Sequence, residues 1–316
     1  SIKTYSRDYR MKVLVTGAAG LIGSHLCDSL LEQNYDVYGI DDLSFGNKSN
    51  LSDRVTFFKD TVENTSSVYG KFDIIYHLAS LKKVWDGSIS SCDVMDVNFN
   101  MTKAVVGKAL KDNSKLIFTS TSDIYGNSET FLEDSDITMG APTNMRYSYA
   151  LSKWHSEQYI LNAMAENRLN CSIVRVFGCA SSRSNRSWSG GHVPLFVNLA
   201  LEGKDITIHG DGMQTRSISH AKDIAQGLVK MANVTGEIVN LGTDEQTTVK
   251  SVAEYIIKKT NSKSNIKYIP REEVFGNYNE ILVRFANISK AKKLIDYKIN
   301  FNTQQVIDEI IKEFTT

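Results

Sequence analysis

Tyr149 and Lys153 have residue types and a spacing that could support acid–base chemistry. They stand four residues apart in a segment with helical periodicity, so both side chains lie on one face of a helix. An ammonium group near a phenol stabilises the phenolate and lowers the pKa of the tyrosine. Such a phenol can act as a general base toward a hydroxyl group near neutral pH. Because Tyr-x-x-x-Lys also occurs by chance on exposed helices, the pair indicates catalysis only when a binding site lies beside it.

Thr121 supplies a third polar group, in the run FTSTSDIYG at residues 118–126. It ends an apolar, β-branched segment that is typical of a buried strand. In open α/β folds, ligands bind at the carboxyl edge of the sheet. We therefore expect the Thr121 hydroxyl to emerge at that edge.

A glycine-rich loop, Gly17-Ala-Ala-Gly20-Leu-Ile-Gly23, directly follows the first expected strand and opens a helix. Glycines there permit a tight turn and let backbone amides approach a pyrophosphate at the helix N-terminus. Asp41 comes 18 residues after Gly23 (41 − 23) and ends the second expected strand. Its carboxylate can accept hydrogen bonds from an adenosine ribose and repel a 2′-phosphate, which favours NAD over NADP. The alternative is a glycine-rich turn without a ligand; Asp42 could share the ribose contact or be a solvated turn acid.

Short β-branched runs alternate with longer helical segments up to about residue 175. The runs are almost continuously apolar, as parallel strands buried on both faces must be. This alternation predicts an α/β fold with a Rossmann-like, doubly wound parallel sheet. The expected strands are 12–16, 36–40, 55–58, 73–77, 115–119 and 171–176, and the expected helices are 21–32, 90–111 and 147–166.

The composition of the chain and its pattern of expected elements change after residue 176. A polar stretch at 181–191, SSRSNRSWSGG, reads as a loop, and mixed helices and short strands follow, ending in an amphipathic helix at about 304–314. We expect an NAD-binding Rossmann domain at 11–175, with contributions from about 216–244. The segments 176–215 and 245–316 are expected to form a smaller, C-terminal, substrate-binding lobe.

The composition excludes several classes of protein. The chain has 36 Lys+Arg and 36 Asp+Glu, a formal net charge of +0, which argues against a nucleic-acid binder. No apolar run is long enough to span a bilayer, and the first ten residues are too polar for a signal peptide. The four cysteines form no C-x-x-C pair, and no His or Cys cluster has metal-ligand spacing. We therefore expect a cytoplasmic protein without a metal, a membrane partner or a nucleic-acid partner.

Five motifs follow one another along the chain: TGAAGLIG (16–23), HLAS (77–80), STSDIYG (120–126), YALSK (149–153) and GDGMQTR (210–216). In this order they resemble the extended short-chain dehydrogenase/reductase family, in its nucleotide-sugar epimerase, dehydratase and decarboxylase branch. The resemblance runs from Met11 to about Tyr297. It implies bound NAD, a nucleoside-diphospho-sugar substrate and a homodimer formed through the helices at 90–111 and 147–166. The expected cofactor-binding residues are Gly17, Gly20, Leu21, Ile22, Gly23, Asp41, Asp60, Leu78, Ala79, Asn98, Tyr149 and Lys153.

The resemblance also implies a catalytic triad of Thr121, Tyr149 and Lys153. Tyr149 would take the proton of the sugar C4 hydroxyl while a hydride passes from C4 to NAD, and Thr121 would hold the same oxygen. Lys153 would set the pKa of the tyrosine and bind the nicotinamide ribose, and Asn98 would order the lysine and a water. The resulting 4-keto sugar can lose water, lose carbon dioxide, or turn over and be reduced on its other face.

Asp123 is the main indication of which outcome follows. It lies two residues beyond Thr121, where similar dehydratases and decarboxylases carry an acid, usually Glu, and typical 4-epimerases a small or apolar residue. A carboxylate beside C5 favours a lyase, either a 4,6-dehydratase or a UDP-uronic acid decarboxylase. A 4-epimerase is the first alternative, and a 4-ketoreductase with net cofactor turnover is the second. Asp123 could instead cap its turn, and Arg146 could hold a sugar carboxylate or be a surface residue.

Arg216 and Arg284 match arginines that contact the diphosphate and its ribose in related enzymes, although either could be a surface ion-pair member. Guanidinium groups suit bidentate phosphate binding. The chain departs from the family after residue 177, where relatives continue with Asn and then Tyr-Gly-Pro. Here Gly178, Cys179 and Ala180 follow, so Gly178 offers no side-chain amide to the substrate. Cys179 could line the sugar site or be a small apolar filler.

Overall fold

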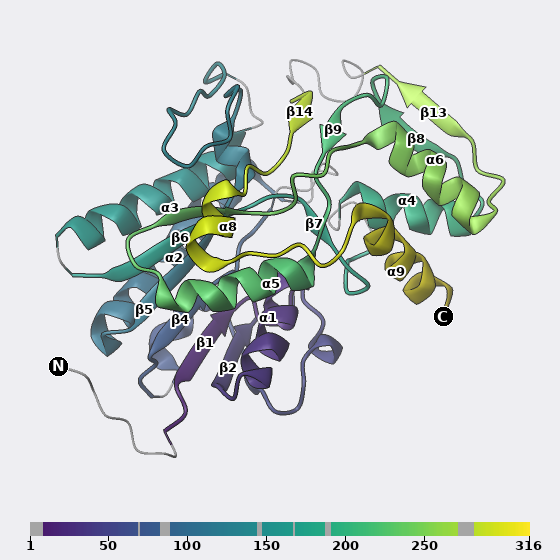
Figure 1. The fold of residues 1–316 in the computed structure, drawn as a ribbon. Coiled ribbons are helices and arrows are strands. Elements are labelled where there is room, and N and C mark those ends of the chain that lie inside the picture. The colour runs from purple at the N-terminus through teal and green to yellow at the C-terminus, as the bar shows by residue number, and fades with distance from the viewer. Residues whose placement is uncertain are drawn as a thin grey trace.

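The computed structural model describes residues 9–68, 70–82, 89–143, 147–166, 168–186, 191–270 and 281–316 (Figure 1). Of the residues singled out in the sequence, Arg146 lies outside the described residues. All other candidate site residues lie within them.

The central sheet has seven parallel strands within the described residues, in the order β11-β6-β5-β4-β1-β2-β3. This confirms the Rossmann-like, doubly wound sheet. The strand order reverses between β1 and β4, where such folds open a crevice for ligands. The strands are β1 (Lys12–Thr16), β2 (Asp36–Asp41), β3 (Thr56–Lys59), β4 (Ile74–His77), β5 (Lys115–Thr121), β6 (Asn170–Val176) and β11 (Ile238–Leu241).

Helices cover both faces of the sheet. Helices α1 (Leu21–Glu32), α5 (Ala221–Lys230) and α8 (Ser289–Ile295) share one hydrophobic core, and α2 (Ser91–Asp112) and α3 (Ser148–Ala165) share the other. Strand β1 shows why its sequence is continuously apolar: Val13 and Val15 pack into the first core and Leu14 into the second. The short helices η1 (Lys48–Asn50), η2 (Val62–Ser67), η3 (Ser122–Tyr125) and η6 (Met231–Asn233) join these elements.

The expected element bounds agree with the structure to within one or two residues. Local sequence explains the ends of α2: the Ser90 side chain accepts hydrogen bonds from Cys92 N and Asp93 N, and Asn113 stops the helix in the left-handed conformation at φ 57°.

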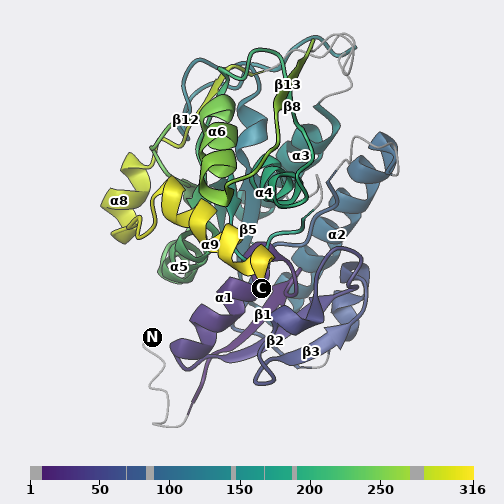
Figure 2. The same cartoon turned by 90° about the vertical axis from the view of Figure 1, so that its right-hand side faces the viewer.

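A third core lies beyond the sheet and joins α4 (His192–Leu201), β8 (Ile206–His209), α6 (Val249–Thr260) and α9 (Thr303–Thr315). We call these elements, with β13 (Ile266–Ile269), the C-terminal lobe. Figure 1 shows it on the right, away from α2 and α3, and Figure 2 looks onto it with β1 to β3 below. Short strands connect the lobe to the sheet: β7 (Cys179–Ala180), β9 (Thr215–Arg216), β10 (Ser219–His220), β12 (Thr247–Thr248) and β14 (Val283–Arg284).

Candidate functional site

The glycine loop has a shape that larger residues could not adopt. Gly17 has φ +68°, and a Cβ there would lie 2.9 Å from the backbone of Ala79. A Cβ on Gly23 would lie 2.1 Å from the carbonyl oxygen of Gly17. Gly20 is the N-cap of α1, and Leu21 and Ile22 are its first residues. The loop therefore brings the N-terminus of α1 to the carboxyl edge of the sheet, where a diphosphate can be bound.

Asp41 ends β2 beside this loop and is buried, with 8% of its surface exposed. Its Oδ2 accepts a hydrogen bond from Ala19 N at 3.0 Å, and its Oδ1 accepts one from Leu43 N at 2.8 Å. Burial raises the pKa of Asp41, while the two backbone N–H groups act to lower it. Each carboxylate oxygen keeps a second lone pair, so Asp41 can still accept from ribose hydroxyls.

Two neighbouring acids behave differently. Asp42 is exposed, and its Oδ1 accepts from the backbone and the hydroxyl of Ser44, so it caps its own turn. Asp60 follows β3, and its backbone N–H donates to the Asp41 carbonyl at 3.3 Å. Asp41 and Asp60 therefore stand next to each other at the half of the edge where an adenosine is expected.

Thr16 organises the loop that carries Leu78 and Ala79. Its Oγ1 accepts hydrogen bonds from Leu78 N at 3.1 Å and Ala79 N at 3.2 Å and lies 2.7 Å from His77 Nδ1. Because this oxygen already accepts from two backbone N–H groups, its single proton is donated to Nδ1 of His77. An imidazole that accepts at Nδ1 is neutral. Burial, followed by the charge of Lys153, lowers the pKa of His77 to about 3, in agreement. With the glycine loop and Asp41, this arrangement fits a dinucleotide.

Tyr149 lies in the first turn of α3 at the carboxyl edge of the sheet. Its hydroxyl is 3.5 Å from Ser80 Oγ, on the loop after β4. Burial raises the pKa of Tyr149, whereas Lys82 and the Ser80 hydroxyl lower it and the charge of Asp123 raises it.

The effect of Lys153 on the pKa of the phenol remains a prediction. Lys153 shares the helix face with Tyr149, but its Nζ lies 4.4 Å from the centroid of the Phe118 ring on β5. It is 3% exposed, and burial lowers the pKa of Lys153 to about 7, against the opposing effect of Glu157. The lysine stem runs toward the sheet, because apolar β5 packs beneath this face of α3.

Lys82 is the cation beside the phenol, and the sequence analysis missed it. Its Nζ lies 5.8 Å from the centroid of the Tyr149 ring. Desolvation lowers the pKa of Lys82, but Tyr149, Asp123 and Cys179 together raise it above its usual value. The sequence did contain an indication that Lys82 belongs to the site, because it comes two residues after the HLAS motif, on a loop at the ligand-binding edge.

Asp123 and Arg284 form an ion pair at this edge, although they are 161 residues apart in the sequence. Asp123 lies in η3, directly after β5, and its backbone N–H donates to Thr121 Oγ1 at 3.2 Å. We call Lys82, Thr121, Asp123, Tyr149 and Arg284 the sheet-edge cluster. The expected contact of Arg284 with a diphosphate remains a prediction; in the structure its guanidinium contacts Asp123.

Asn98 holds the loop that carries Lys82. Its Nδ2 donates to the Leu81 carbonyl at 2.9 Å, and its Oδ1 accepts from Leu81 N at 2.6 Å. Its Nδ2 also donates to Ser152 Oγ at 3.0 Å, and Ser152 lies between Tyr149 and Lys153 in α3. Asn98 therefore joins the loop after β4 to the helix that carries both residues of the expected acid–base pair.

Arg216 and Arg284 are brought together by a small sheet. Strand β14 pairs with β9 in parallel, with Arg284 opposite Arg216. Arg216 Nη1 donates to the carbonyls of Thr215 and Ile281, each at 2.8 Å. His192, the first residue of α4, faces Arg216; burial and then Arg216 lower the pKa of His192 to about 4. The two arginines singled out in the sequence thus lie in register on neighbouring strands.

Gly178 is explained by backbone packing. A Cβ at this position would lie 2.6 Å from the carbonyl oxygen of Ser217. The Gly178 carbonyl accepts from Ser219 N at 3.0 Å, where β7 and β10 pair. An asparagine here, as in relatives, would require the segment at Ser217 to move. Cys179 lies in β7 close enough to Lys82 for their charges to interact.

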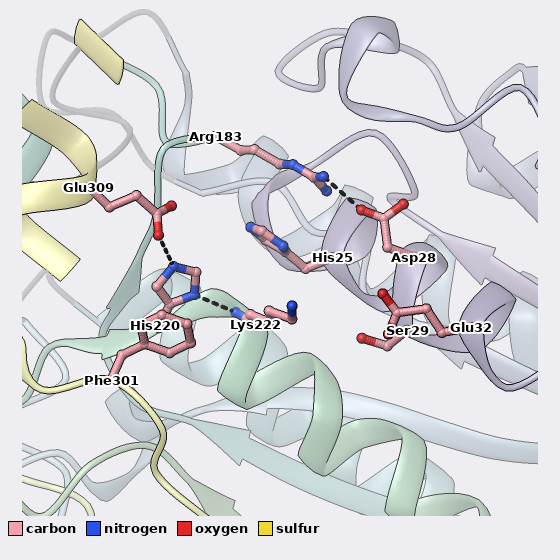
Figure 3. A pocket seen from close by; sticks show the side chains of 9 residues that line it. All are labelled: His25, Asp28, Ser29, Glu32, Arg183, His220, Lys222, Phe301 and Glu309. Carbon is pink, nitrogen blue, oxygen red and sulfur yellow. Dashed lines mark hydrogen bonds and ion pairs between the residues drawn. The ribbon is translucent and has the colours of Figure 1, made fainter. Parts of the chain in front are cut away.

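A second polar region lies apart from the sheet-edge cluster, where the C-terminal lobe meets α1 and α5 (Figure 3). We call it the interlobe pocket; its volume is about 240 Å³. His220 Nε2 lies 2.7 Å from Glu309, Arg183 forms an ion pair of 2.6 Å with Asp28, and His25 Nε2 lies 2.9 Å from Ser181 Oγ. It is lined by His25, Asp28, Ser29, Glu32, Arg183, His220, Lys222, Phe301 and Glu309.

Within the described residues, no group of three or more His, Cys, Asp and Glu side chains is arranged to hold a metal ion. Across the same part of the chain, no helix combines the length and the apolar character needed to cross a membrane.

Comparisons with known proteins agree with this geometry. The UDP-N-acetyl-alpha-D-glucosaminuronate decarboxylase of Bacillus cytotoxicus is 30% identical over 315 residues, covering 96% of this chain and 98% of that protein. UDP-glucuronic acid decarboxylase 1 of Danio rerio is 28% identical over 319 residues, covering 99% and 75%. The UDP-glucose 4-epimerase of Thermotoga maritima, solved with UDP-glucose, superposes with a TM-score of 0.85 at 23% identity, covering 96% and 99% of the two chains.

The structure of the Thermus thermophilus UDP-glucose 4-epimerase in complex with NAD gives a TM-score of 0.84 at 22% identity, covering 96% and 99%. At such identities the two solved structures establish the fold. The family model described as "NAD dependent epimerase/dehydratase family" matches residues 13–242. The chain therefore belongs to the NAD-dependent epimerase/dehydratase family and is an enzyme that uses NAD.

Proposed function

We propose that this enzyme decarboxylates a nucleoside-diphospho-uronic acid through a transient 4-keto intermediate. The observation that carries the proposal is the Asp123–Arg284 ion pair beside Tyr149. The pair lies next to the group expected at C4, where C5 and C6 of a bound sugar would be. The 30% identity to a uronate decarboxylase over nearly the whole chain supports the same reaction.

The first step is oxidation at C4. Tyr149 removes the proton of the C4 hydroxyl and Thr121 holds the same oxygen. When bound at the glycine loop, NAD supplies a reversible hydride acceptor. Lys153, buried beneath Tyr149 in α3, is placed to bind the nicotinamide ribose, and Asp41 to bind the adenosine ribose.

Carbon dioxide is then lost from the β-keto acid. The C5–C6 bond breaks, its electron pair enters the C4 ketone to give an enolate, and C6 departs as carbon dioxide. A proton must then reach C5, and Asp123 with Arg284 is placed to order its source. Tyr149 would then give its proton back to the C4 oxygen while bound NAD would supply the hydride for C4, which completes a nucleotide pentose.

Decarboxylation is favoured over loss of water by the state of Asp123. Loss of water needs an acid at the C6 hydroxyl in addition to a base at C5. The carboxylate that lies beside Tyr149 is engaged with a guanidinium, which favours its charged form over a proton donor. Carbon dioxide needs no leaving-group acid. A 4-epimerase is less well supported, because it needs no carboxylate at this position.

The nucleotide half of the substrate is assigned to Arg216 and the N-terminus of α4. Arg216 lies in register with Arg284, so a diphosphate at Arg216 would direct the sugar toward the sheet-edge cluster. We propose the division expected from the sequence: residues 11–175 with about 216–244 bind NAD, and 176–215 with 245–316 bind the nucleotide sugar. The separate core of the C-terminal lobe supports this division.

We also propose a homodimer formed through α2 and α3. Met95 and Tyr159 on these helices are 41% and 39% exposed. Between them, Phe99 stacks on His155 with ring centroids 3.9 Å apart. An exposed apolar and aromatic stripe of this kind suits an interface between copies. Sedimentation of the wild type and of a Tyr159→Lys variant tests it, with a monomeric variant expected.

A cytoplasmic location is proposed from the cysteines. All four thiols are free, and that of Cys92 is exposed. Free thiols persist in a reducing compartment.

The proposed reaction is tested by incubating the NAD-loaded protein with UDP-glucuronate, UDP-N-acetylglucosaminuronate and a panel of neutral UDP-, GDP-, dTDP- and CDP-sugars. Mass spectrometry of the products separates the possible outcomes. Loss of carbon dioxide from a uronate is expected. Loss of water from a neutral sugar would identify a dehydratase, and unchanged mass with altered chromatography would identify an epimerase.

A further inference from the structure

Lys82 is a cation of the sheet-edge cluster that the proposed reaction has not yet used. Its ammonium lies 5.8 Å from the centroid of the Tyr149 ring, and Asp123 and Cys179 are close enough to act, with Tyr149, to raise the pKa of Lys82. These three neighbours belong to α3, η3 and β7. Lys82 therefore stands where segments from three parts of the chain converge on the expected sugar site.

The position of Lys82 is fixed by its neighbour in the chain. Leu81 has both its backbone N–H and its carbonyl bound to the Asn98 side chain, at 2.6 Å and 2.9 Å. Asn98 is itself bound to Ser152 in α3, and it is 3% exposed. The backbone that presents Lys82 is thus tied to the helix that presents Tyr149.

Lys82 remains accessible to a ligand. The residue as a whole is exposed, although its ammonium end is desolvated by its neighbours, and none of the ion pairs found among the described residues includes Lys82. The other two cations near this edge are engaged differently, since Arg284 contacts Asp123 and Lys153 is buried over Phe118. An accessible ammonium beside a desolvated phenol is suited to an anionic group of the substrate.

We propose that Lys82 binds the C6 carboxylate of a nucleoside-diphospho-uronic acid and so selects uronates over neutral hexoses. The inference rests on the proposed function for its placement of C4 at Tyr149 and C5 at Asp123. C6 is bonded to C5, so a cation that interacts with both residues is adjacent to C6.

The same location suits the movement of charge in the reaction. As the C5–C6 bond breaks, negative charge leaves the carboxylate and collects on the oxygen at C4. Because Lys82 lies beside Tyr149 as well as Asp123, one ammonium stays close to the charge throughout. Lys82 would then compensate the substrate's charge before and after carbon dioxide departs.

The test compares NAD-loaded wild type with Lys82→Met, which removes the charge, and Lys82→Arg, which keeps it. Dissociation constants are measured by calorimetry for UDP-glucuronate and UDP-glucose, together with kcat, KM and the pH profile. Lys259→Met is the matched control, because Lys259 lies 5.9 Å from the Tyr255 ring on α6, away from the site.

Lys82→Met is expected to weaken uronate binding about tenfold or more, which is about 1.4 kcal/mol, and to change UDP-glucose binding little. Lys82→Arg should restore most of the preference.

Equal losses for both ligands, or a shifted pH profile with unchanged uronate affinity, would overturn the inference. If Lys82→Met binds uronates as tightly as the wild type, and the wild type releases carbon dioxide, the inference about Lys82 is wrong and the proposed function stands. A wild type that binds uronates through Lys82 but releases no carbon dioxide, as a uronate 4-epimerase would, leaves the inference standing and removes the proposed function.

Discussion

The sheet-edge cluster and the interlobe pocket are both rich in titratable groups, but they differ in how those groups are partnered. In the interlobe pocket, His220 pairs with Glu309 and Arg183 with Asp28 (Figure 3), and His25 Nε2 lies 2.9 Å from Ser181 Oγ. At the sheet edge, Asp123 pairs with Arg284, but the Tyr149 hydroxyl has a 3.5 Å contact with Ser80, and the Lys82 ammonium lies beside the Tyr149 ring.

This difference separates groups that hold the fold together from groups that await a substrate. His220 illustrates the first kind: its Nδ1 accepts from Lys222 N at 3.0 Å, so Nε2 carries the proton that it donates to Glu309. Each nitrogen has a partner supplied by the chain. A cluster of ionisable side chains therefore indicates a reactive site only where some of their hydrogen-bond donors and acceptors remain available to a ligand. Changes at the edge should reduce activity with little effect on stability, and changes in the pocket should do the reverse.

The largest effect is expected for Tyr149→Phe. Loss of the general base should lower kcat by about 10²- to 10⁴-fold, while the free energy of unfolding changes little because the hydroxyl contact with Ser80 is 3.5 Å long. Steady-state kinetics and urea unfolding measure the two quantities. Tyr268→Phe, at an exposed position of β13 in the C-terminal lobe, is the control. Full activity of Tyr149→Phe on the true substrate would contradict the acid–base assignment.

Asp123→Asn should come next, with product formation about 10²-fold slower. The change keeps the shape of the side chain but removes the charge opposite Arg284. Oxidation and the loss of carbon dioxide should survive, so mixing enzyme and substrate should still give a rise in NADH absorbance, while the protonation of C5 and the formation of the pentose are slowed. Asp134→Asn, on an exposed turn, is the control. Formation of the pentose at the wild-type rate would remove Asp123 from its proposed role.

Glu309→Gln should lower the free energy of unfolding by about 1–2 kcal/mol and leave kcat unchanged. It weakens the acceptor of His220, at 2.7 Å, in a contact that joins the C-terminal lobe to the start of α5. Chemical denaturation measures the loss. Glu313→Gln, exposed on the same helix, should have no effect. A large drop in kcat at unchanged stability would mean that the pocket belongs to the catalytic machinery.

The smallest effect concerns pH. Burial, followed by Arg183 and His220, lowers the pKa of His25 to about 3 from 6.5, and Glu309 acts in the opposite direction. Between these values the unfolded chain binds a proton that the folded chain does not. His25 thus contributes fully to stability above pH 6.5 and loses this contribution as the pH falls toward 3.

A His25→Gln variant should therefore lose about 1 kcal/mol less than the wild type between about pH 7.5 and 5.5. Denaturation of the variant and of the wild type at both pH values measures the difference. The pKa values of His77 and His192 are lowered as well, so the variant should keep part of the dependence of the unfolding free energy on pH. Identical slopes in variant and wild type would mean that His25 is not desolvated as described.

Much of the site was predictable because it follows short-range rules. The loop from Gly17 to Gly23 needed glycine at a positive φ and at two close backbone approaches, and the spacing of its residues expressed that need. Thr121 and Asp41 could be placed because each ends a strand, and strand ends meet at one edge of a parallel sheet. The position of the Lys153 ammonium over the Phe118 ring was not predictable, because helix spacing fixes a shared face but not where a long side chain turns.

The amino-acid sequence by itself determined the order and bounds of the strands and helices and the motifs at their ends, since these depend on periodicity and on neighbouring residues. Tertiary structure alone decided that Arg284 meets Asp123 across 161 residues, that Ser217 fills the space beside Gly178, and that Lys82 stands over Tyr149. Each of these contacts depends on loops that follow different strands and come together only when the sheet and the lobe have packed. Local patterns carry no information about such distances, because they are set by packing between elements and not within them.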